Sequence, residues 1–387
     1  MRVRYLLHNA YGVGGTIRTV VNQANALCSD HDVEIASVYR TSATPSFTID
    51  ERVRLVSLTD LRPNGSRHTD PPDGNTRFSR KTRRFPNPFI YRADHRYRRW
   101  DPVVDLAIAR YLRSARDGVL VTTRPALNMM SARLTPRRVV RVAQDHMNLD
   151  SYGPRLRAAI LKSYPRLDAV TVLTEHDLAA YEKALEGVRL ERIPNGIPPK
   201  DPSTVAHDRP RIVASGRLAP QKGFDMLLDA WATVSAKHPE WELVIYGSGP
   251  GFRKLVEQRD ALGLRESVRL PGVTSQLDAE LSASAMFVLS SRYEGLPMVL
   301  LEAMSCGLPV VSFDCPTGPG EVITDGVNGR LVPPADVDAL AATILELIDS
   351  PERRLAMGEA AYETSRRFFM PSVRDAWERF FASLTPR

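Results

Sequence analysis

The stretch "MFVLSSRYEGLPMVLLEAMSCGLPVVSFD", Met286–Asp314, decides the fold. It begins with a short apolar run, passes through a polar loop, continues after Pro297 as an apolar segment of helical length and ends in a second apolar run. Proline suits the first turn of a helix, and short apolar strands joined by helices are typical of parallel sheets covered on both faces. The stretch therefore predicts a strand–helix–strand unit.

Two glutamates in this stretch lie in or next to an apolar run, and their position there needs a physical explanation. Glu302 is the only charged residue in the apolar run after Pro297, and Glu294 lies eight residues before it. A buried ionised group costs several kcal/mol or more unless something pairs with it. Eight helical residues would set the two side chains about 80° apart with a rise of about 12 Å, which suits two parts of one elongated ligand. Carboxylates accept hydrogen bonds well from sugar hydroxyls; a structural salt bridge from Glu302 to an arginine is the alternative.

The same alternation of strand and helix runs through both halves of the chain. Expected strands are "VRYLLHN", "DVEIASVY", "GVLVTT", "VVRVAQD" and "AVTVLT" in the first half, and "RIVASG", "WELVIYG", "SVRLPG", "MFVLSS", "PVVSFD" and "GRLVP" in the second. We therefore predict an α/β fold of two doubly wound, Rossmann-like domains facing a central cleft. The predicted parts are an N-terminal domain 1–197, a proline-rich linker 198–210, a C-terminal domain 211–365 and a final helix 366–387 that crosses back to the first domain.

Composition narrows the class of protein. The chain has 387 residues, 43% of them apolar and 25% charged, as in ordinary globular proteins. The three cysteines, Cys28, Cys306 and Cys315, have neither disulfide-scaffold nor zinc-site spacing, which favours reduced thiols in a cytosol. No apolar run reaches membrane-spanning length, and the first residues do not form a signal peptide. We expect a cytoplasmic protein that can touch the inner face of the cell membrane.

The basic charge of the chain is concentrated in one segment, which we expect to be an insertion at about 62–100. It holds eleven Lys and Arg against three Asp, with aromatic residues among them, whereas the rest of the chain sums to about −1. A solvated loop is one interpretation, and a docking surface for an anionic membrane or an anionic acceptor polymer is another. Nucleic acid is not expected as a partner, because no recognised nucleic-acid-binding module surrounds the segment.

Two loops carry the side chains and turns expected for anion binding. After the first strand, Gly14 and Gly15 precede a helix that Thr16 could cap, so the turn could bind an anion or simply be a tight βα turn. In the second half, Arg217 and Lys222 surround a short loop after a strand. Such a pair can hold a diphosphate without a metal, and two surface cations are the alternative. The glycine spacing is not the full G-x-G-x-x-G, and no acidic residue ends the second strand, which argues against a nicotinamide dehydrogenase.

With these residues in view, "RYEGLPMVLLEAMSCGLPVV" resembles the E-x7-E signature of the retaining family 4 glycosyltransferases, glycosyl transferases group 1 with the GT-B fold. The motifs "IPNGI", "GRLAPQKGFDMLLDAW", "VIYGSGP", "RLPG" and "GEVITDGVNGRLVPP" are similar to that family's and follow in the same order. The resemblance covers the second half and the glycine turn of the first. Residues 40–120 fit it least.

The resemblance implies a role for each candidate residue. Glu302 would accept the ribose hydroxyls of the nucleotide, Glu294 would face the hydroxyls of the transferred sugar, and Arg217 and Lys222 would hold the diphosphate. His146 resembles the histidine that touches the donor sugar near the reacting carbon, although a lone histidine is otherwise often structural. The remaining donor-binding candidates are Gly14, Gly15 and Thr16 near the diphosphate, Tyr246, Gly247, Gly249, Gly272 and Val273 near the base, and Gly295, Leu296 and Pro297 near the sugar and phosphates.

The implied reaction is transfer of a hexosyl group from a nucleotide sugar, a UDP-sugar, with retention at the anomeric carbon. The implied acceptor is a cell-envelope polymer, a polysaccharide or a lipid-linked molecule. Neither a metal nor another cofactor is expected. A non-catalytic sugar-nucleotide or polymer-binding module on the same fold is the principal alternative, and a phosphorylase is disfavoured because no pyridoxal-binding lysine motif is evident.

Overall fold

The computed structural model describes residues 1–62, 102–201 and 209–384. The predicted basic insertion, apart from Arg62, and the middle of the predicted linker therefore lie outside the described residues. The chain divides into two compact units, Met1–Gly196 with Met370–Arg387, and Ile197–Phe369. We call them the N-terminal unit and the C-terminal unit.

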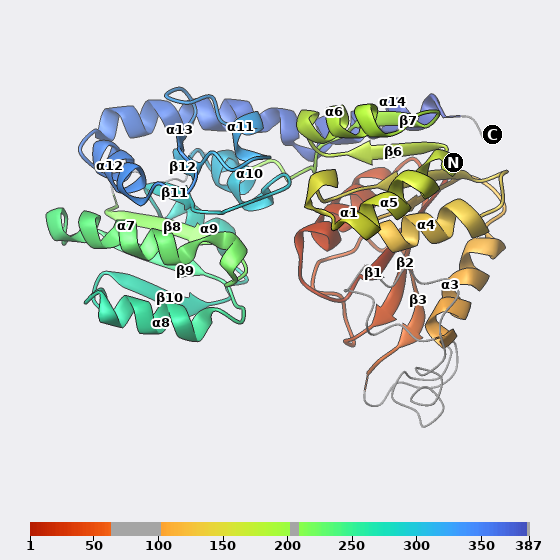
Figure 1. The fold of residues 1–387 in the computed structure, drawn as a ribbon, viewed down its shortest axis with the longest axis horizontal. Coiled ribbons are helices and arrows are strands. Elements are labelled where there is room, and N and C mark those ends of the chain that lie inside the picture. The colour runs from red at the N-terminus through yellow and green to blue at the C-terminus, as the bar shows by residue number, and fades with distance from the viewer. Residues whose placement is uncertain (63–101, 202–208, 385–387) are drawn as a thin grey trace. The chain divides into compact units, whose positions relative to one another are not determined.

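The N-terminal unit is built on a seven-stranded sheet with the order β3-β2-β1-β4-β5-β6-β7, and every pair of neighbouring strands is parallel. Its order reverses between β1 and β4. Figure 1 shows β1, β2 and β3 next to one another and β6 and β7 in another part of the same unit. The strands are β1 (Arg2–Asn9), β2 (Asp32–Arg40), β3 (Arg54–Asp60), β4 (Val119–Thr122), β5 (Val140–Gln144), β6 (Ala169–Val172) and β7 (Arg189–Arg192).

Helices cover both faces of this sheet, as parallel strands require. Because side chains alternate along a strand, Val119 and Val121 of β4 join the apolar cluster under two helices, while Leu120 joins the cluster under the others. The first cluster includes the buried Trp377 of α14, the C-terminal helix. The helices are α1 (Gly15–Leu27) and α14 (Met370–Ala382) on one face, and α3 (Pro102–Ser114), α4 (Pro125–Leu134), α5 (Pro154–Ser163) and α6 (Glu175–Ala184) on the other.

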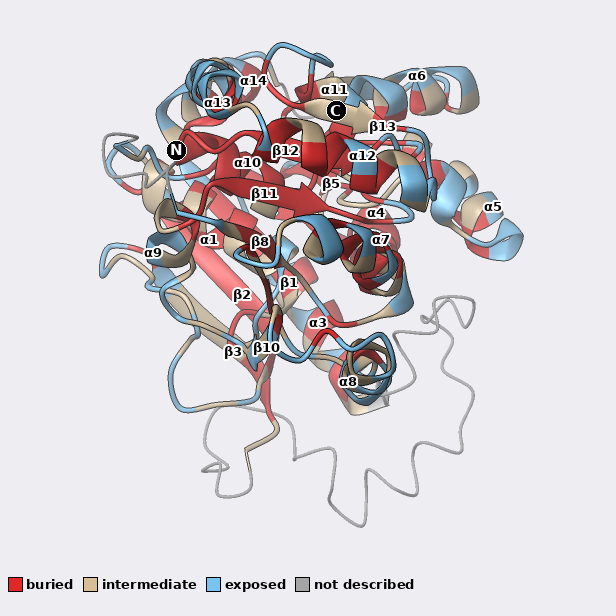
Figure 2. Cartoon of the chain, turned by 90° about the vertical axis from the view of Figure 1, so that its left-hand side faces the viewer, coloured by how far each residue is buried: buried red, intermediate tan, exposed pale blue. Residues whose placement is uncertain are grey.

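The C-terminal unit has a second parallel sheet, with the order β10-β9-β8-β11-β12-β13. The strands are β8 (Arg211–Ser215), β9 (Glu242–Tyr246), β10 (Val268–Gly272), β11 (Met286–Leu289), β12 (Val310–Phe313) and β13 (Arg330–Val332). The central strands β8, β11 and β12 are largely buried and lie under helices with exposed outer faces (Figure 2). The helices are α7 (Phe224–Lys237), α8 (Phe252–Ala261), α9 (Leu277–Ser282), α10 (Met298–Ser305), α11 (Pro319–Val322), α12 (Val337–Ile348) and α13 (Pro351–Ser365).

The predicted fold class, two Rossmann-like parallel-sheet domains, is confirmed. The stretch Met286–Asp314 forms β11, α10 and β12 in succession, as its pattern predicted. All three cysteines are unpaired and buried. Among the described helices, none combines the length and the apolar character that crossing a membrane requires.

Candidate functional site

Two loops of the C-terminal unit meet where the order of its sheet reverses, between β8 and β11. In open parallel sheets, ligands bind outside the carboxyl ends of the strands at this point. The hydroxyl of Ser290 donates to the carbonyl of Lys222 at 2.9 Å, and the amide of Arg292 donates to the carbonyl of Gln221 at 2.8 Å. The loop after β8 and the loop after β11 therefore form one connected surface.

Lys222 and Glu294 form an ion pair in this surface. Lys222 Nζ lies 2.6 Å from Glu294 Oε1, and the Ser291 hydroxyl donates to the same oxygen at 2.5 Å. The side chains are 16% and 8% exposed. The stem of Lys222 runs over Gly216, where an added Cβ would lie 3.0 Å from Lys222 Cε. The fold thus brings two predicted residues together, and the cation compensates the charge of a buried carboxylate.

Arg292 fastens the two loops to α7. Its Nη1 and Nη2 lie 2.8 and 2.6 Å from the two carboxylate oxygens of Asp225, and Nη1 also donates to the carbonyl of Pro220 at 2.7 Å. The hydrogen bonds from the Arg292 guanidinium hold the pKa of Asp225 below its usual range. Sequence reasoning missed this pair, whose only signal was the position of Arg292 beside Glu294.

A third loop, between β12 and α11, holds the backbone around Glu294. The Thr317 hydroxyl donates to the carbonyl of Glu294. Gly318 has a φ of 93°, and a Cβ there would lie 2.0 Å from the carbonyl oxygen of Gly295, so the contact requires glycine. Sequence reasoning gave neither Ser291 nor Thr317 a role toward Glu294.

Glu302 lies in the second turn of α10 and is 2% exposed. The helix begins one residue later than the proline pattern predicts, because Pro297 is its N-cap residue and Met298 its first residue. Leu296, just before the cap, is 7% exposed. The side chain of Glu302 is therefore buried, on the helix that follows the loop carrying Glu294.

Arg217 differs from Lys222. It lies in the same loop but is exposed, and it forms no ion pair with any residue that the structure describes. The fold therefore does not join it to the Lys222–Glu294 pair.

The remaining C-terminal candidates lie after β9 and at the end of β10. The Tyr246 ring is buried, its hydroxyl accepts a hydrogen bond from Arg211 at 2.8 Å, and burial raises its pKa. A Cβ on Gly247 would lie 1.8 Å from the carbonyl oxygen of Gly216, and the Gly247 amide donates to Gly272 at 2.8 Å. The glycines thus allow close backbone packing between loops. A Cβ on Gly249 would likewise meet the carbonyl of Leu218, and Val273 is 68% exposed.

The glycine turn of the N-terminal unit follows β1. Gly14, not Thr16, is the N-cap of α1, and no side chain caps this end. The expected capping role of Thr16 was therefore wrong, because α1 begins at Gly15 and Thr16 already lies in its first turn. Gly14 and Gly15 are exposed, and a Cβ on either would meet no atom within 4 Å.

His146 follows β5 and stands beside an unusual buried acid, Asp145. The hydroxyls of Tyr152 and Tyr181 donate to the two carboxylate oxygens of Asp145, each at 2.5 Å. Burial raises the pKa of Asp145 to about 6, against the effect of these hydrogen bonds. Burial, with a smaller effect of Arg124, lowers the pKa of His146 to about 3, and His146 Nε2 has no hydrogen-bond partner among the described residues. The low pKa keeps the imidazole of His146 neutral near pH 7, and its Nε2 is buried without a hydrogen-bond partner in the described ranges.

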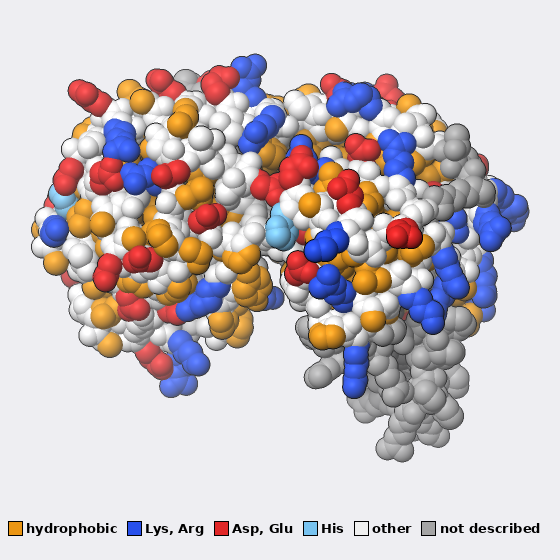
Figure 3. All heavy atoms as spheres, turned by 45° about the horizontal axis from the view of Figure 1, so that its top comes forward, with side chains coloured by type: hydrophobic (Ala, Val, Ile, Leu, Met, Phe, Trp, Pro, Cys, Tyr) orange, Lys and Arg blue, Asp and Glu red, His pale blue; other side chains and the backbone are white. Residues whose placement is uncertain are grey.

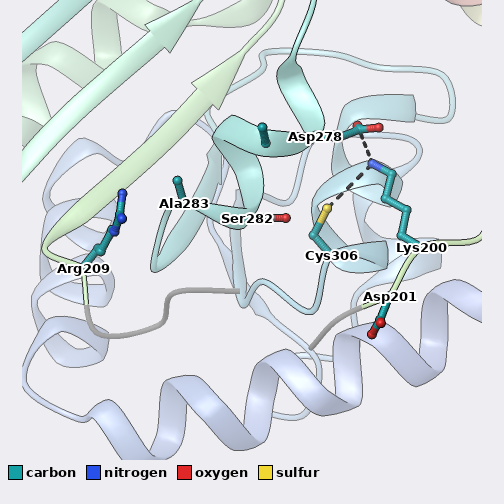
Figure 4. Close-up of a pocket in the computed structure, with 8 residues that line it drawn as sticks. Lys200, Asp201, Arg209, Asp278, Ser282, Ala283 and Cys306 are labelled. Carbon is teal, nitrogen blue, oxygen red and sulfur yellow. Dashed lines mark hydrogen bonds and ion pairs between the residues drawn. The ribbon is translucent and has the colours of Figure 1, made fainter. Parts of the chain in front are cut away.

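A pocket of about 580 Å³ in the C-terminal unit contains none of the predicted residues (Figure 4). Lys200 projects between α9 and α10, with its Nζ 2.5 Å from Asp278 and 3.7 Å from the Cys306 sulfur (Figure 4). A smaller pocket of about 290 Å³ is bordered by Pro220, Asp225 and Arg292. In the described part of the chain, no three His, Cys, Asp or Glu side chains are grouped as metal ligands would be.

Sequence comparison finds relatives along the whole chain. The family model described as glycosyl transferases group 1 matches residues 199–364. An exopolysaccharide phosphotransferase of Streptomyces coelicolor is 34% identical over 390 residues, which cover all of this chain and 41% of the relative, so the chain spans about two-fifths of that protein's length. A GDP-mannose-dependent alpha-(1-6)-phosphatidylinositol monomannoside mannosyltransferase of Mycolicibacterium smegmatis is 31% identical over 256 residues, 60% of this chain and 67% of the relative.

A solved structure shares the fold. It is a mutant of TarM from S. aureus in complex with fondaparinux, alpha-GlcNAc-glycerol and UDP. The TM-score is 0.77 with 16% sequence identity, and the match covers 99% of this chain and all of that one.

Proposed function

The chain belongs to the glycosyl transferases of group 1, and we propose that it transfers a hexosyl group from a UDP-sugar to a cell-envelope polymer, a polysaccharide or a lipid-linked acceptor. We further propose that the anomeric configuration of the sugar is retained and that no metal takes part. The observation that carries the proposal is the ion pair between Lys222 and the buried Glu294 at the reversal point of the C-terminal sheet. A UDP complex of the fold relative TarM supports the choice of UDP, whereas GDP-mannose serves the mycobacterial relative.

In this proposal the ion pair exchanges partners when the donor binds. The diphosphate attracts Lys222 Nζ, and Arg217, which is exposed in the same loop, supplies a second cation. Glu294 Oε1 then accepts a hydroxyl of the transferred sugar in place of the lysine. Ser291 and Thr317 keep the carboxylate and its backbone fixed during the exchange. Glu302 accepts the ribose hydroxyls.

The chemical step breaks the bond between the anomeric carbon and the diphosphate oxygen and forms a bond from the same carbon to the acceptor oxygen. The acceptor hydroxyl attacks the anomeric carbon from the same face of the sugar as the departing diphosphate. It loses its proton to that diphosphate. Lys222 stabilises the negative charge that develops on the leaving group, and the fixed loops supply orientation. The roles of His146 and of the glycine turn toward the donor rest on the family resemblance alone.

The test is release of nucleoside diphosphate by the purified chain. UDP-, GDP- and ADP-sugars are incubated separately with acceptor extracts, and the linkage formed is read from the anomeric proton coupling. We expect UDP release and an α-linked product from an α-linked donor. Binding without release of any nucleotide would favour the non-catalytic module, and release of GDP alone would overturn the choice of donor. Loss of activity in EDTA, restored by a divalent cation, would overturn metal independence.

A further inference from the structure

Three helices of the N-terminal unit end at the same edge of its sheet. The segments after α3, α4 and α5 lead into β4, β5 and β6, which are adjacent and parallel. Because the amino ends of neighbouring parallel strands lie side by side, the three helix ends share one edge. The glycine turn and His146 follow the carboxyl ends of β1 and β5, at the opposite edge.

Eight exposed cations occupy these helix ends, and we call them the basic helix-end surface. None of the eight forms an ion pair with another residue in the described ranges. The surface consists of Arg110, Arg113, Arg116, Arg133, Arg137, Arg138, Lys162 and Arg166. Figure 3 shows Lys and Arg side chains gathered along one flank of this unit.

The acids nearest to this edge are already engaged by other arginines. Asp117 pairs with Arg4 at 3.0 Å, and the buried Asp168 pairs with Arg141 at 2.9 Å. The surface therefore keeps its positive charge.

Helix dipoles explain only part of this charge. A cation in the last turn stabilises a helix, and Arg113, Arg133 and Lys162 each have that position. Arg110 lies before the last turn of α3, and the other four lie beyond the ends of α3, α4 and α5: Arg116, Arg137, Arg138 and Arg166. Like charges on neighbouring segments repel one another, so their accumulation without compensation indicates a partner of opposite charge.

We propose that the basic helix-end surface docks onto an anionic lipid bilayer. Helices that pack side by side are about 8–10 Å apart, so three helix ends spread the cations over about 20 Å, as a plane of headgroups would require. Among the described side chains of α3, α4 and α5, Leu106 is the one large apolar side chain that is well exposed, so attachment is electrostatic. This inference does not depend on the proposed function.

Vesicle binding by the full chain tests the proposal. Cosedimentation is measured with vesicles of phosphatidylcholine alone and of phosphatidylcholine mixed with phosphatidylglycerol. We expect binding only to the mixed vesicles, and release by added salt. Vesicle binding that is unchanged by added salt, or equal for the two lipid compositions, overturns the proposal.

A matched pair of variants locates the surface. The first carries Arg110→Gln, Arg116→Gln, Arg137→Gln and Arg138→Gln, which spare the last-turn cations. The control carries Lys237→Gln, Arg253→Gln, Arg265→Gln and Arg353→Gln, four exposed cations of the C-terminal unit. Each basic residue near an anionic bilayer strengthens binding about fivefold, so the first variant should lose at least about tenfold in affinity while the control changes less than about twofold.

Two results would overturn the assignment. In one, both variants bind mixed vesicles as the wild type does. In the other, the first variant keeps vesicle binding but loses binding to soluble poly(glycerol phosphate), which would identify a polymer as the partner. Thermal unfolding of the first variant, compared with the control, verifies that its loss of binding is not a loss of fold.

Discussion

The two units of the chain differ in the sign and in the use of their charge. The C-terminal unit has 17 Lys and Arg against 23 Asp and Glu, and the N-terminal unit 35 against 22. In the first, Lys222 pairs with the buried Glu294, and Arg292 pairs with Asp225. In the second, the eight cations of the basic helix-end surface are exposed and form no ion pair within the described ranges. The C-terminal unit thus uses charge to build a site, and the N-terminal unit to attract a partner.

Replacement of Lys222 has the largest expected effect. Lys222→Ala removes the cation proposed to stabilise the departing diphosphate, and loss of one such group lowers turnover by about 10²- to 10³-fold. Nucleotide release at saturating donor measures it. Lys237→Ala, an exposed cation at the end of α7, is the control and should leave turnover unchanged. Turnover within a few-fold of wild type in Lys222→Ala would remove the distinction between a site cation and a surface cation.

A second comparison concerns two buried carboxylates. Glu294 has a lysine partner, whereas Asp145 has two tyrosine hydroxyls and forms no ion pair in the described part of the chain. The folded state holds the Asp145 proton more tightly than an unfolded chain, whose aspartates titrate near 3.8. The protonation of Asp145 therefore stabilises the folded state fully below about pH 3.8. This stabilisation is lost as the pH rises through about 6.

Asp145→Asn should remove this pH dependence. The shift of about two pKa units corresponds to about 3 kcal/mol. The free energy of unfolding of the wild type, relative to the variant, should therefore fall by about that amount between about pH 4 and pH 7. Urea unfolding at several pH values measures it, and Asp150→Asn, an exposed acid in the same loop, is the control. A constant difference between wild type and variant would show that the two tyrosines suffice to keep Asp145 ionised.

Loss of the lysine partner of Glu294 should lower the free energy of unfolding as well as turnover. Lys222→Ala leaves a nearly buried carboxylate without a cation, and adding Glu294→Gln removes that charge. Because an uncompensated buried charge is costly, we expect the double variant to be more stable than Lys222→Ala by about 2 kcal/mol. Chemical denaturation measures the difference. A double variant less stable than Lys222→Ala would mean that solvent already compensates Glu294.

The strands of the C-terminal unit could be predicted from sequence, and those of the N-terminal unit only in part. All six strands of the C-terminal sheet have a counterpart among the expected runs, such as "RIVASG" for β8. The missed strands, β3 and β7, are the two edges of the N-terminal sheet. An edge strand is covered on fewer sides, so "RLER" in β7 can be polar and lacks the apolar run that marks a buried parallel strand.

The candidate site could be predicted from sequence only in part. Position after a strand and residue type singled out Lys222 and Glu294, because both features belong to the local sequence. The hydrogen bond from Thr317 could not be inferred, since it joins residues 23 positions apart through the loop after β12. The same holds for the salt bridge between Arg292 and Asp225. Residues that position a site act across loops, and local patterns do not record such contacts.

The smallest expected effect concerns this positioning. Thr317→Val removes the hydrogen bond to the Glu294 carbonyl at nearly constant volume, and one such bond contributes about 1 kcal/mol, or about fivefold. We expect turnover to fall by about that factor with little change in KM for the donor, since Glu302 and the cations remain. Thr317→Ser keeps the hydroxyl and should restore turnover. If Ser and Val behave alike, or if only stability falls, the loop after β12 supports the fold and not the site. The contrast between the units would then rest on the Lys222–Glu294 pair alone.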